Sequence, residues 1–301
     1  MYILELIKIL RNRFTKKRFF VRVYHIEDNI VIYNDVDITL KYNIQLFDNI
    51  DKMVIQIMHD VKKKIEEKYS VINEMVSVII PNYNNQIFLK KTISKILDNT
   101  YKNIEIIIID DKSTDNSINI IKSFENEKIK IFENKENSGT YYSRNRGILM
   151  SKGNYILIVD GDDYIDPTYI QNMLDGLKNS GDNIWGYGKH FERLHLNNNL
   201  NVIRKKKGSF YNILFKRKLF NYLGFFQNSR YGADAEYIFR ARIYKYPINF
   251  DNYNNNIEYH ANTIKNKNLT QIIDWSKRHQ YITKAKKDVY LRNYIEMAYL
   301  D

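Results

Sequence analysis

The chain contains no cysteine among its 301 residues. A disulfide framework, a cysteine-ligated zinc site and a thiol nucleophile are therefore excluded. No uncharged apolar stretch approaches the roughly 18 to 20 residues that span a bilayer. Positive charges at residues 11–18 follow the first apolar run, whereas a secretory signal places them before it. The sequence predicts a cytoplasmic protein with no transmembrane segment, whose amphipathic start packs as a helix; peripheral contact with a membrane surface is the alternative.

Two common nucleotide-binding signatures are also missing. No apolar run is followed by G-x-G-x-x-G, and no G-x-x-x-x-G-K-[ST] loop occurs anywhere in the chain. The first motif binds dinucleotides and the second cradles nucleoside triphosphates. The sequence therefore favours neither a nicotinamide enzyme nor a P-loop NTPase.

Basic residues outnumber acidic ones. Lys and Arg number 47 against 35 Asp and Glu, which gives a net charge of +12, while 44% of residues are hydrophobic, as in an ordinary globular protein. Such a balance favours anionic partners, namely nucleic acid, an acidic membrane surface or phosphorylated small molecules. No recognisable nucleic-acid module is present, and acidic clusters would repel phosphate. We therefore predict no nucleic-acid partner.

Regular alternation of strand and helix patterns marks the middle of the chain. Continuous apolar runs are typical of parallel strands that are buried on both faces, and strands alternating with helices indicate a doubly wound α/β sheet. The predicted strands are residues 76–80, 104–109, 129–132 and 155–159, and the predicted helices cover residues 89–97, 118–124 and 166–177.

Polar clusters follow these apolar runs. In an open α/β sheet, ligands bind outside the carboxyl ends of the strands. Asp110 and Asp111 end one run, and Asp160, Asp162 and Asp163 end another. Carboxylates this close repel one another unless a cation neutralises them, and a divalent ion with an attached diphosphate would do so. The alternative is a solvated acidic turn.

Four motifs in order resemble family 2 of the GT-A-fold glycosyltransferases. They are VSVIIPNYN at residues 76–84, IIIIDDKSTD at 106–115, Gly139 with SRNRG at 143–147, and VDGDD at 159–163. The resemblance covers about residues 75–180 and continues more faintly to about 265. It implies a GT-A fold and a nucleotide-sugar donor.

The resemblance implies roles for residues around the nucleoside. Pro81 and Tyr83 would line the pocket, with the Tyr83 ring against the base. Asp111 would accept a hydrogen bond from the uracil ring NH. Arg144 would approach the base or the phosphates, in a loop shaped by Asn145 and Gly147; an ordinary cation on a surface helix is the alternative for Arg144.

The same family pattern implies a metal site. Asp160 would contact the ribose and the metal, Gly161 would belong to the donor site, and Asp162 would ligate Mn²⁺ or Mg²⁺ directly. His260 resembles a distal histidine that completes the metal shell; an ordinary polar-loop histidine is the alternative.

The expected catalytic base lies in YGADAEYIFR at residues 231–240. Asp234 takes the position of the family's base, but Ala233 stands where the family usually has Glu. Glu236 is a fallback that would point elsewhere on a helix. A helix N-cap after Gly232 is the alternative role for Asp234.

Together these features predict an inverting glycosyltransferase that moves a sugar from a UDP-sugar, or another nucleotide-diphosphate sugar, to an acceptor hydroxyl on a glycan, lipid-linked or protein acceptor. The alternative is a non-catalytic sugar-nucleotide-binding relative with a structural or docking role. The oligomeric state is left open.

The predicted divisions are an α+β extension over 1–74, a nucleotide-sugar-binding half over 75–188, an acceptor-binding half over 189–265 that contains a basic loop at 204–207, and C-terminal helices over 266–301.

Overall fold

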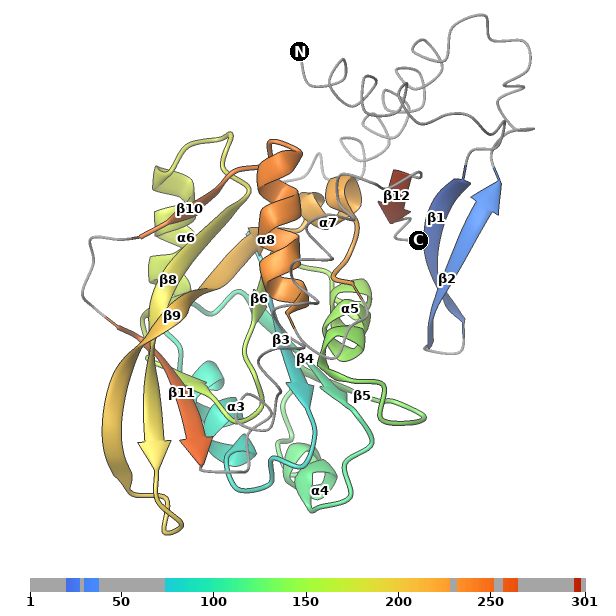
Figure 1. The fold of residues 1–301 in the computed structure, drawn as a ribbon. Helices are drawn as coiled ribbons and strands as arrows, with labels where there is room; N and C mark the ends of the chain where they lie inside the picture. Colours follow the sequence, from blue (N-terminus) through green and yellow to red (C-terminus); the bar gives the residue numbers. More distant parts are fainter. Residues whose placement is uncertain are drawn as a thin grey trace, which may run out of the picture.

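Two β-sheets organise the protein (Figure 1). The computed structural model describes residues 20–27, 30–37, 74–227, 232–251, 257–264 and 295–298. The larger sheet has nine strands in the order β5-β4-β3-β6-β9-β8-β11-β7, with β10 paired to β8, and the smaller sheet has the order β12-β1-β2. No helix in the described ranges is long and apolar enough to cross a membrane.

Four parallel strands form the half of the large sheet that the apolar runs predict. These are β3 (Val76–Asn82), β4 (Ile104–Asp110), β5 (Ile129–Glu133) and β6 (Tyr155–Ile158). Every residue of β3 and β4 is buried. Continuous burial follows from helices that cover both faces of the sheet, so the predicted α/β fold is confirmed.

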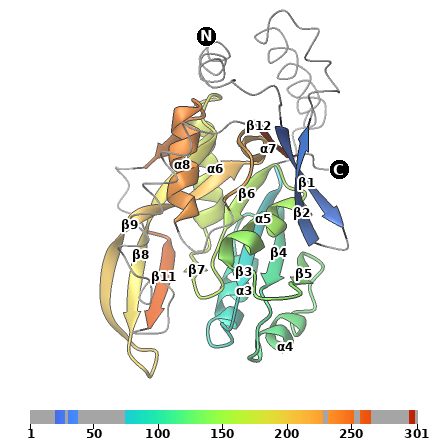
Figure 2. The same ribbon diagram turned by 45° about the vertical axis from the view of Figure 1, so that its right-hand side comes forward.

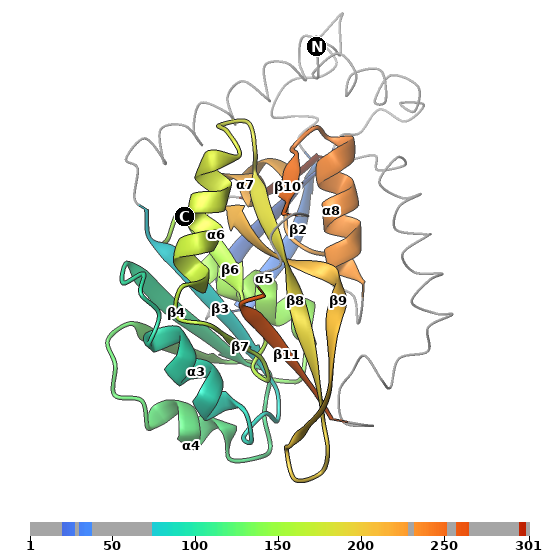
Figure 3. The same cartoon turned by 90° about the vertical axis from the view of Figure 1, so that its left-hand side faces the viewer.

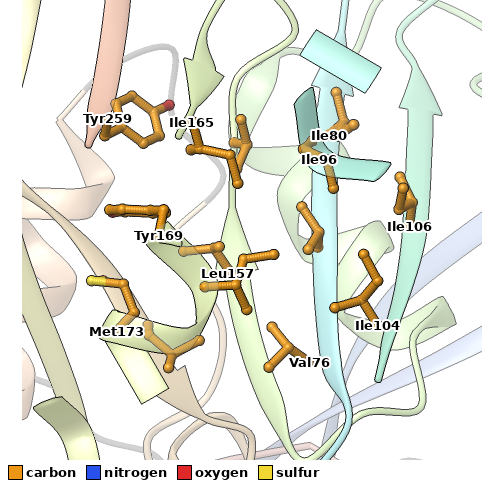
Figure 4. Close-up of a cluster of buried hydrophobic side chains, with 14 of the residues drawn as sticks. Val76, Ile80, Ile96, Ile104, Ile106, Leu157, Ile165, Tyr169, Met173 and Tyr259 are labelled. Carbon is orange, nitrogen blue, oxygen red and sulfur yellow. The ribbon is translucent and has the colours of Figure 1, made fainter. Parts of the chain in front are cut away.

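Alternate residues of β3 enter different hydrophobic clusters. Val78 and Ile80 pack with α3 (Leu89–Leu97), α4 (Ser117–Lys122) and α6 (Tyr169–Asn179), and Figure 4 shows part of this cluster. Ile79 faces the other cluster, with α5 (Thr140–Met150), α7 (Lys218–Leu223) and α8 (Ala233–Ile243). This two-layer cover leaves the carboxyl edge of the strands as the place for a site.

Helix α5 corrects the predicted loop at residues 143–147. Its polar side chains Ser143, Asn145 and Arg146 are buried, so the segment lacks the apolar stripe by which a surface helix is recognised. A Cβ on Gly147 would lie 2.4 Å from Ile79 Cγ2. The absence of that side chain allows α5 to lie directly on β3.

The other half of the large sheet is a long hairpin of β8 (Gly186–Leu196) and β9 (Val202–Lys216). Strand β11 (Tyr259–Ile264) runs parallel to β8, β7 (Tyr164–Ile165) pairs with β11, and β10 (Ile248–Phe250) pairs with β8. The predicted basic loop at 204–207 is wrong, because these residues pair with β8 inside β9. A strand whose two faces are both exposed can carry consecutive basic residues. Such a run has no apolar alternation, so its local composition is typical of a loop.

Segments near the two ends of the chain share the small sheet. Strand β1 (Phe20–Glu27) pairs antiparallel with β2 (Ile30–Asp37) and parallel with β12 (Ile295–Ala298). The helix predicted for the C-terminal segment is therefore wrong at residues 295–298, which form a strand. The strand depends on pairing with β1, and local sequence patterns do not indicate a partner that lies so far away in the chain. The rest of that predicted helical segment, and the packed amphipathic helix predicted at the start of the chain, lie outside the described residues. The four-part division of the chain stays a prediction.

Candidate active site

The carboxyl end of β4 carries two carboxylates with different surroundings. Asp110 is buried and accepts hydrogen bonds from Asn82 Nδ2 at 2.7 Å and from Ser113 Oγ at 2.6 Å. These bonds tie the loop after β4 to the end of β3. Asp110 is therefore a residue that shapes the site.

Asp111 holds the segment that leads into α5. Its Oδ1 accepts from Asn134 Nδ2 at 2.7 Å and from the Ser138 backbone N–H at 2.8 Å, and its Oδ2 accepts from the Gly139 N–H at 2.8 Å. Each carboxylate oxygen has two lone pairs, so Oδ2 retains an acceptor position. The expected contact with uracil stays a prediction that would use this position.

The end of β3 and the turn after β6 lie close together, beside the residues predicted to contact the nucleoside. Gly161 N–H donates to the Pro81 carbonyl at 3.3 Å, and a Cβ on Gly161 would lie 2.8 Å from Asn82 Oδ1. A side chain at position 161 would therefore push the acidic turn away from β3. Tyr83, just beyond Pro81, is 46% exposed, so its ring is accessible to a ligand.

Asp160 is paired with a cation from α5. Arg144 Nη2 lies 2.8 Å from Asp160 Oδ1 and 3.1 Å from Oδ2. Burial lowers the pKa of Arg144, but the charge and hydrogen bond of Asp160, together with Tyr141 and Asp234, raise that pKa above its usual value. One charge of the acidic cluster is thus neutralised by the protein.

Asp163 anchors the acidic turn. It is buried, its Oδ2 accepts from Tyr259 Oη at 2.7 Å, and its Oδ1 accepts from the Asn262 N–H at 3.1 Å. Burial raises the pKa of Asp163, and the charges of Asp162 and Asp160 raise it further. The solvated acidic turn considered above is therefore wrong for Asp163, which is a structural group.

His260 lies in β11 rather than in a polar loop. Its Nε2 is 3.2 Å from Asp166 Oδ1, its Nδ1 is 3.3 Å from Glu192 Oε2, and its ring stacks on Tyr164 at 4.6 Å between centroids. Both ring nitrogens thus face carboxylates. Its role in a metal shell stays a prediction.

The candidate metal ligands do not form a preassembled cluster. Across the described ranges, no three His, Asp or Glu side chains are grouped closely enough to hold a metal ion. A Mg²⁺-type ion commonly takes only one or two carboxylates and draws its other ligands from water and substrate phosphates. Asp162 and Asp160 fit the role of these one or two protein carboxylates, because hard carboxylate oxygens suit Mg²⁺ and Mn²⁺.

Asp234 lies in the first turn of α8, where the helix dipole favours a negative charge. Tyr141 Oη donates to Asp234 Oδ1 at 2.8 Å. Burial raises the pKa of Tyr141, and the Asp234 charge raises it further, so the phenol stays a proton donor. The N-cap of α8 is Gly232 in a left-handed conformation; the cap role considered for Asp234 is therefore wrong.

A family model decides the classification of this fold and site. The model described as glycosyl transferase family 2 matches residues 77–232. The chain belongs to this family. The family resemblance of the motifs is thereby confirmed, and the solved structures described below confirm the GT-A fold. Asp111, Arg144, Asp160 and Asp162 lie within the matched segment, and Asp234 lies just beyond it.

Curated relatives match a limited part of the chain. It is 38% identical over 103 residues to glycosyltransferase GlyG of Streptococcus pneumoniae, covering 34% of each chain. It is 41% identical over 101 residues to the Escherichia coli protein named UDP-Glc:alpha-D-GlcNAc-diphosphoundecaprenol beta-1,3-glucosyltransferase WfaP, covering 34% of this chain and 40% of WfaP. The match therefore spans well under half the length of these relatives.

Solved structures extend the likeness in fold. The Staphylococcus aureus TarS 1–349 complex with UDP-GlcNAc superposes with a TM-score of 0.54 at 16% identity, covering 70% of this chain and 66% of TarS 1–349. Mannosyltransferase PcManGT of Pyrobaculum calidifontis, in complex with GDP-Man and Mn²⁺, gives 0.52 at 14%, covering 76% and 70%. At these identities the likeness establishes the fold alone.

Ala233 stands where members of family 2 usually have Glu, and the structure shows how this position is used in the present chain. Ala233 is fully buried in a cluster with Phe226 and Tyr237. Because this position faces the core, a carboxylate there would need a buried partner. The position that usually carries Glu in the family therefore contributes packing here.

Glu236, the fallback base, is wrong for that role. Its side chain is fully buried and accepts from Arg240 Nε at 3.0 Å and Nη2 at 2.8 Å. Arg240 also donates to the backbone carbonyls of Leu223 and Phe225. The pair holds the end of α7 and the segment after it against α8.

Tyr141 is the site residue that the sequence did not reveal. It lies three residues before Arg144 and thus on the same face of α5, and the Arg144 guanidinium lies 5.1 Å from its ring centroid. A continuous set of contacts therefore joins Asp160, Arg144, Tyr141 and Asp234. No spacing signal could have indicated it, because Tyr141 and Asp234 are 93 residues apart.

Proposed function

We propose that this family 2 chain is an inverting glycosyltransferase that transfers a sugar from a UDP-sugar to an acceptor hydroxyl. The observation that carries the proposal is the set of contacts from Asp160 through Arg144 and Tyr141 to Asp234. These contacts support the proposal because they connect the candidate donor-side carboxylate with the candidate base, near the carboxyl edge of the sheet where ligands bind in such folds.

The names of similar proteins support the donor class. TarS 1–349 was solved with UDP-GlcNAc, and the name of WfaP gives a UDP-sugar donor and a diphosphoundecaprenol-linked acceptor. We extend these classes to the present chain as a UDP-sugar donor and a glycan or lipid-linked acceptor. The net charge of +12 fits an anionic donor and an anionic acceptor carrier.

In this proposal the side chains have separate tasks. Asp234 removes the proton of the acceptor hydroxyl as general base, and the Tyr141 hydroxyl holds its carboxylate in position. The acceptor oxygen then attacks the anomeric carbon from the face opposite the diphosphate. Asp162 and Asp160 would hold Mn²⁺ or Mg²⁺, which, when bound, supplies Lewis-acid neutralisation of the leaving diphosphate.

A second candidate is a non-catalytic protein that binds a sugar nucleotide. Buried Ala233 favours it, because the family's usual Glu is absent from this site. The two candidates differ in one measurement. An enzyme hydrolyses its donor slowly even without acceptor, whereas the binder gives donor binding with no UDP release under any acceptor tested.

The first prediction concerns the metal. With the wild-type chain, UDP-sugars should raise the melting temperature more in Mn²⁺ than in its absence, since a ligand that binds only the native state stabilises it. Asp162→Ala should abolish the Mn²⁺-dependent part of this shift while the protein stays folded. The exposed Asp98→Ala variant, at the end of α3, is the matched control and should keep the full shift.

An unchanged Mn²⁺-dependent shift in Asp162→Ala would remove the metal assignment. If no UDP-, GDP-, CDP- or TDP-sugar shifts the wild-type melting temperature and no UDP is released, the proposed function itself is rejected. The two failures are thus separable.

A second prediction concerns the base of the nucleotide. Asp111 Oδ2 would accept the uracil ring NH, and cytosine carries no proton at that position. UDP should therefore bind more tightly than CDP by about 1 to 3 kcal/mol, the cost of a buried unsatisfied acceptor. Calorimetric titration of both nucleotides measures this difference. Equal affinities would mean that Asp111 only shapes the loop at residues 134–139.

A further inference from the structure

The far end of the β8–β9 hairpin exposes apolar side chains. Leu200 is 41% exposed, Val202 47% and Ile203 68%, and every residue from 201 to 207 is exposed. Over residues 202–213 the only strand paired with β9 in the described ranges is β8, because β6 meets β9 at Leu214–Lys216. The hairpin end therefore presents a free edge of β9, with aliphatic groups on both faces of the strand.

Cations surround these aliphatic residues. Arg204, Lys205, Lys206 and Lys207 follow them directly in β9, and Arg193 pairs with Lys206 across the hairpin. In the described part of the chain, the acidic side chain paired with these cations is Glu192, whose Oε2 lies 3.7 Å from Lys205 Nζ. The positive field also acts on His195 nearby, whose pKa is lowered by burial and by Arg193, Arg204 and Lys206.

Leu200 occupies a backbone position that does not suit it. Its φ is +61°, in the left-handed region that Gly and Asn adopt most readily. The turn closes with hydrogen bonds between Asn197 and Asn201 and from Leu200 N–H to the Asn197 carbonyl. A large aliphatic group is thus held at the hairpin tip although the turn geometry favours a small or polar residue.

Protection of a strand edge explains only part of this composition. Exposed edge strands commonly carry lysine, which blocks pairing with other chains. That function would be weakened by aliphatic side chains on the same edge, as at Val202 and Ile203. Basic residues that flank exposed aliphatic ones instead match a bilayer interface, where anionic headgroups attract the cations and the acyl boundary takes the aliphatic groups.

The hairpin end lies on the active-site side of the molecule. β9 is antiparallel to both β8 and β6, and β6 is parallel to β3, so β8 runs in the same direction as the strands whose carboxyl ends carry Asp111 and Asp160. In Figures 2 and 3 the tip extends beyond that edge of the sheet, on the same side as α4. A surface that held the tip would therefore lie next to the edge of the sheet that carries the candidate site.

We propose that residues 200–207 of the β8–β9 hairpin, with Arg193, form a docking surface for an anionic lipid bilayer. Leu200, Val202 and Ile203 enter the interface, and the five basic side chains contact the headgroups. The proposal is independent of the sugar transferred and of whether Asp234 is catalytic.

Vesicle flotation of the full chain tests this surface. Vesicles that contain phosphatidylglycerol should carry the protein, and vesicles of phosphatidylcholine alone should not. Replacing Lys205, Lys206 and Lys207 with Gln should weaken binding by on the order of tenfold to a hundredfold, since each basic residue near an anionic surface contributes to the attraction. A control with the same loss of charge replaces the exposed Lys102, Lys152 and Lys178, which lie near the opposite edge of the sheet; it should bind like the wild type.

The aliphatic part is tested separately. Leu200→Asn suits the left-handed backbone, so it should keep or raise the melting temperature while it weakens binding to the vesicles, and Ile203→Ser should weaken it as well. Heparin, a soluble polyanion, should be bound equally by the wild type and by these two variants.

Three results would each overturn the proposal. They are no binding of the wild type to phosphatidylglycerol vesicles, equal losses in the two triple-lysine variants, and wild-type vesicle binding by Leu200→Asn together with Ile203→Ser. The last result would assign the hairpin to a soluble polyanion instead of a bilayer.

Discussion

Replacing Asp234 with asparagine should lower turnover by roughly 10²- to 10⁴-fold while the affinity for the donor changes by no more than a few-fold. Asparagine keeps the size of the side chain and an oxygen that accepts from Tyr141 Oη, whose bond to Asp234 Oδ1 is 2.8 Å long. It cannot take the proton of an acceptor hydroxyl. UDP release with saturating donor measures turnover, and calorimetry measures donor affinity.

Asp175→Asn is the matched control for this substitution. Asp175 lies in α6, away from the site, and accepts from Gln171 Nε2 at 2.9 Å, so turnover should be unchanged. The loss of a negative charge from the first turn of α8 should cost Asp234→Asn only about 0.3 to 1 kcal/mol of stability. Wild-type turnover in the Asp234 variant would assign the base elsewhere, and a much larger loss of stability would make Asp234 a structural residue.

Glu236→Gln should lower the free energy of unfolding by about 3 to 5 kcal/mol, because it leaves Arg240 buried without its charged partner. Both side chains of the pair are almost fully buried. A domain is commonly stable by only about 5 to 15 kcal/mol, so this loss would be a large part of the total. Denaturant-induced unfolding gives the change.

Two further variants sharpen this prediction. Glu236→Leu combined with Arg240→Met removes both charges and should recover part of the lost stability, reduced by the cost of the Leu223 and Phe225 carbonyls that lose their Arg240 donor. Glu74→Gln breaks the exposed pair with Lys178 and should cost no more than about 1 kcal/mol. If Glu236→Gln kept its stability and lost turnover only, the structural role would be refuted and Glu236 would again be a candidate base.

The parallel half of the sheet could be predicted because its signal is local. The apolar runs that form β3 and β4 are buried along their whole length, and this requirement leaves a continuous pattern of β-branched residues in the sequence. The polar residues after each run then have to lie at one edge. For that reason the pattern alone selects the two acidic clusters at the strand ends, and the family resemblance of the motifs singles out Asp111, Asp160 and Asp162 within them.

Contacts between distant residues were decided by the tertiary structure alone. Tyr141 meets Asp234 across 93 residues, and Tyr259 meets Asp163 across 96. Such pairs leave no periodic trace, since each partner is an ordinary polar or aromatic residue in its own segment. The different surroundings of Asp160, Asp162 and Asp163 likewise depend on what other segments bring to them.

The sequence by itself determined the fold class, the edge of the sheet that carries the site and the residue types available there. Only the tertiary structure decided that residues 140–150 form a helix and that residues 204–207 lie in a strand. In the helix, polar side chains are buried because neighbouring segments supply their hydrogen bonds, as Phe226 does for Asn145. In the strand, consecutive basic residues are stable because β8 pairs with the backbone on one edge, while water reaches the other edge and the side chains.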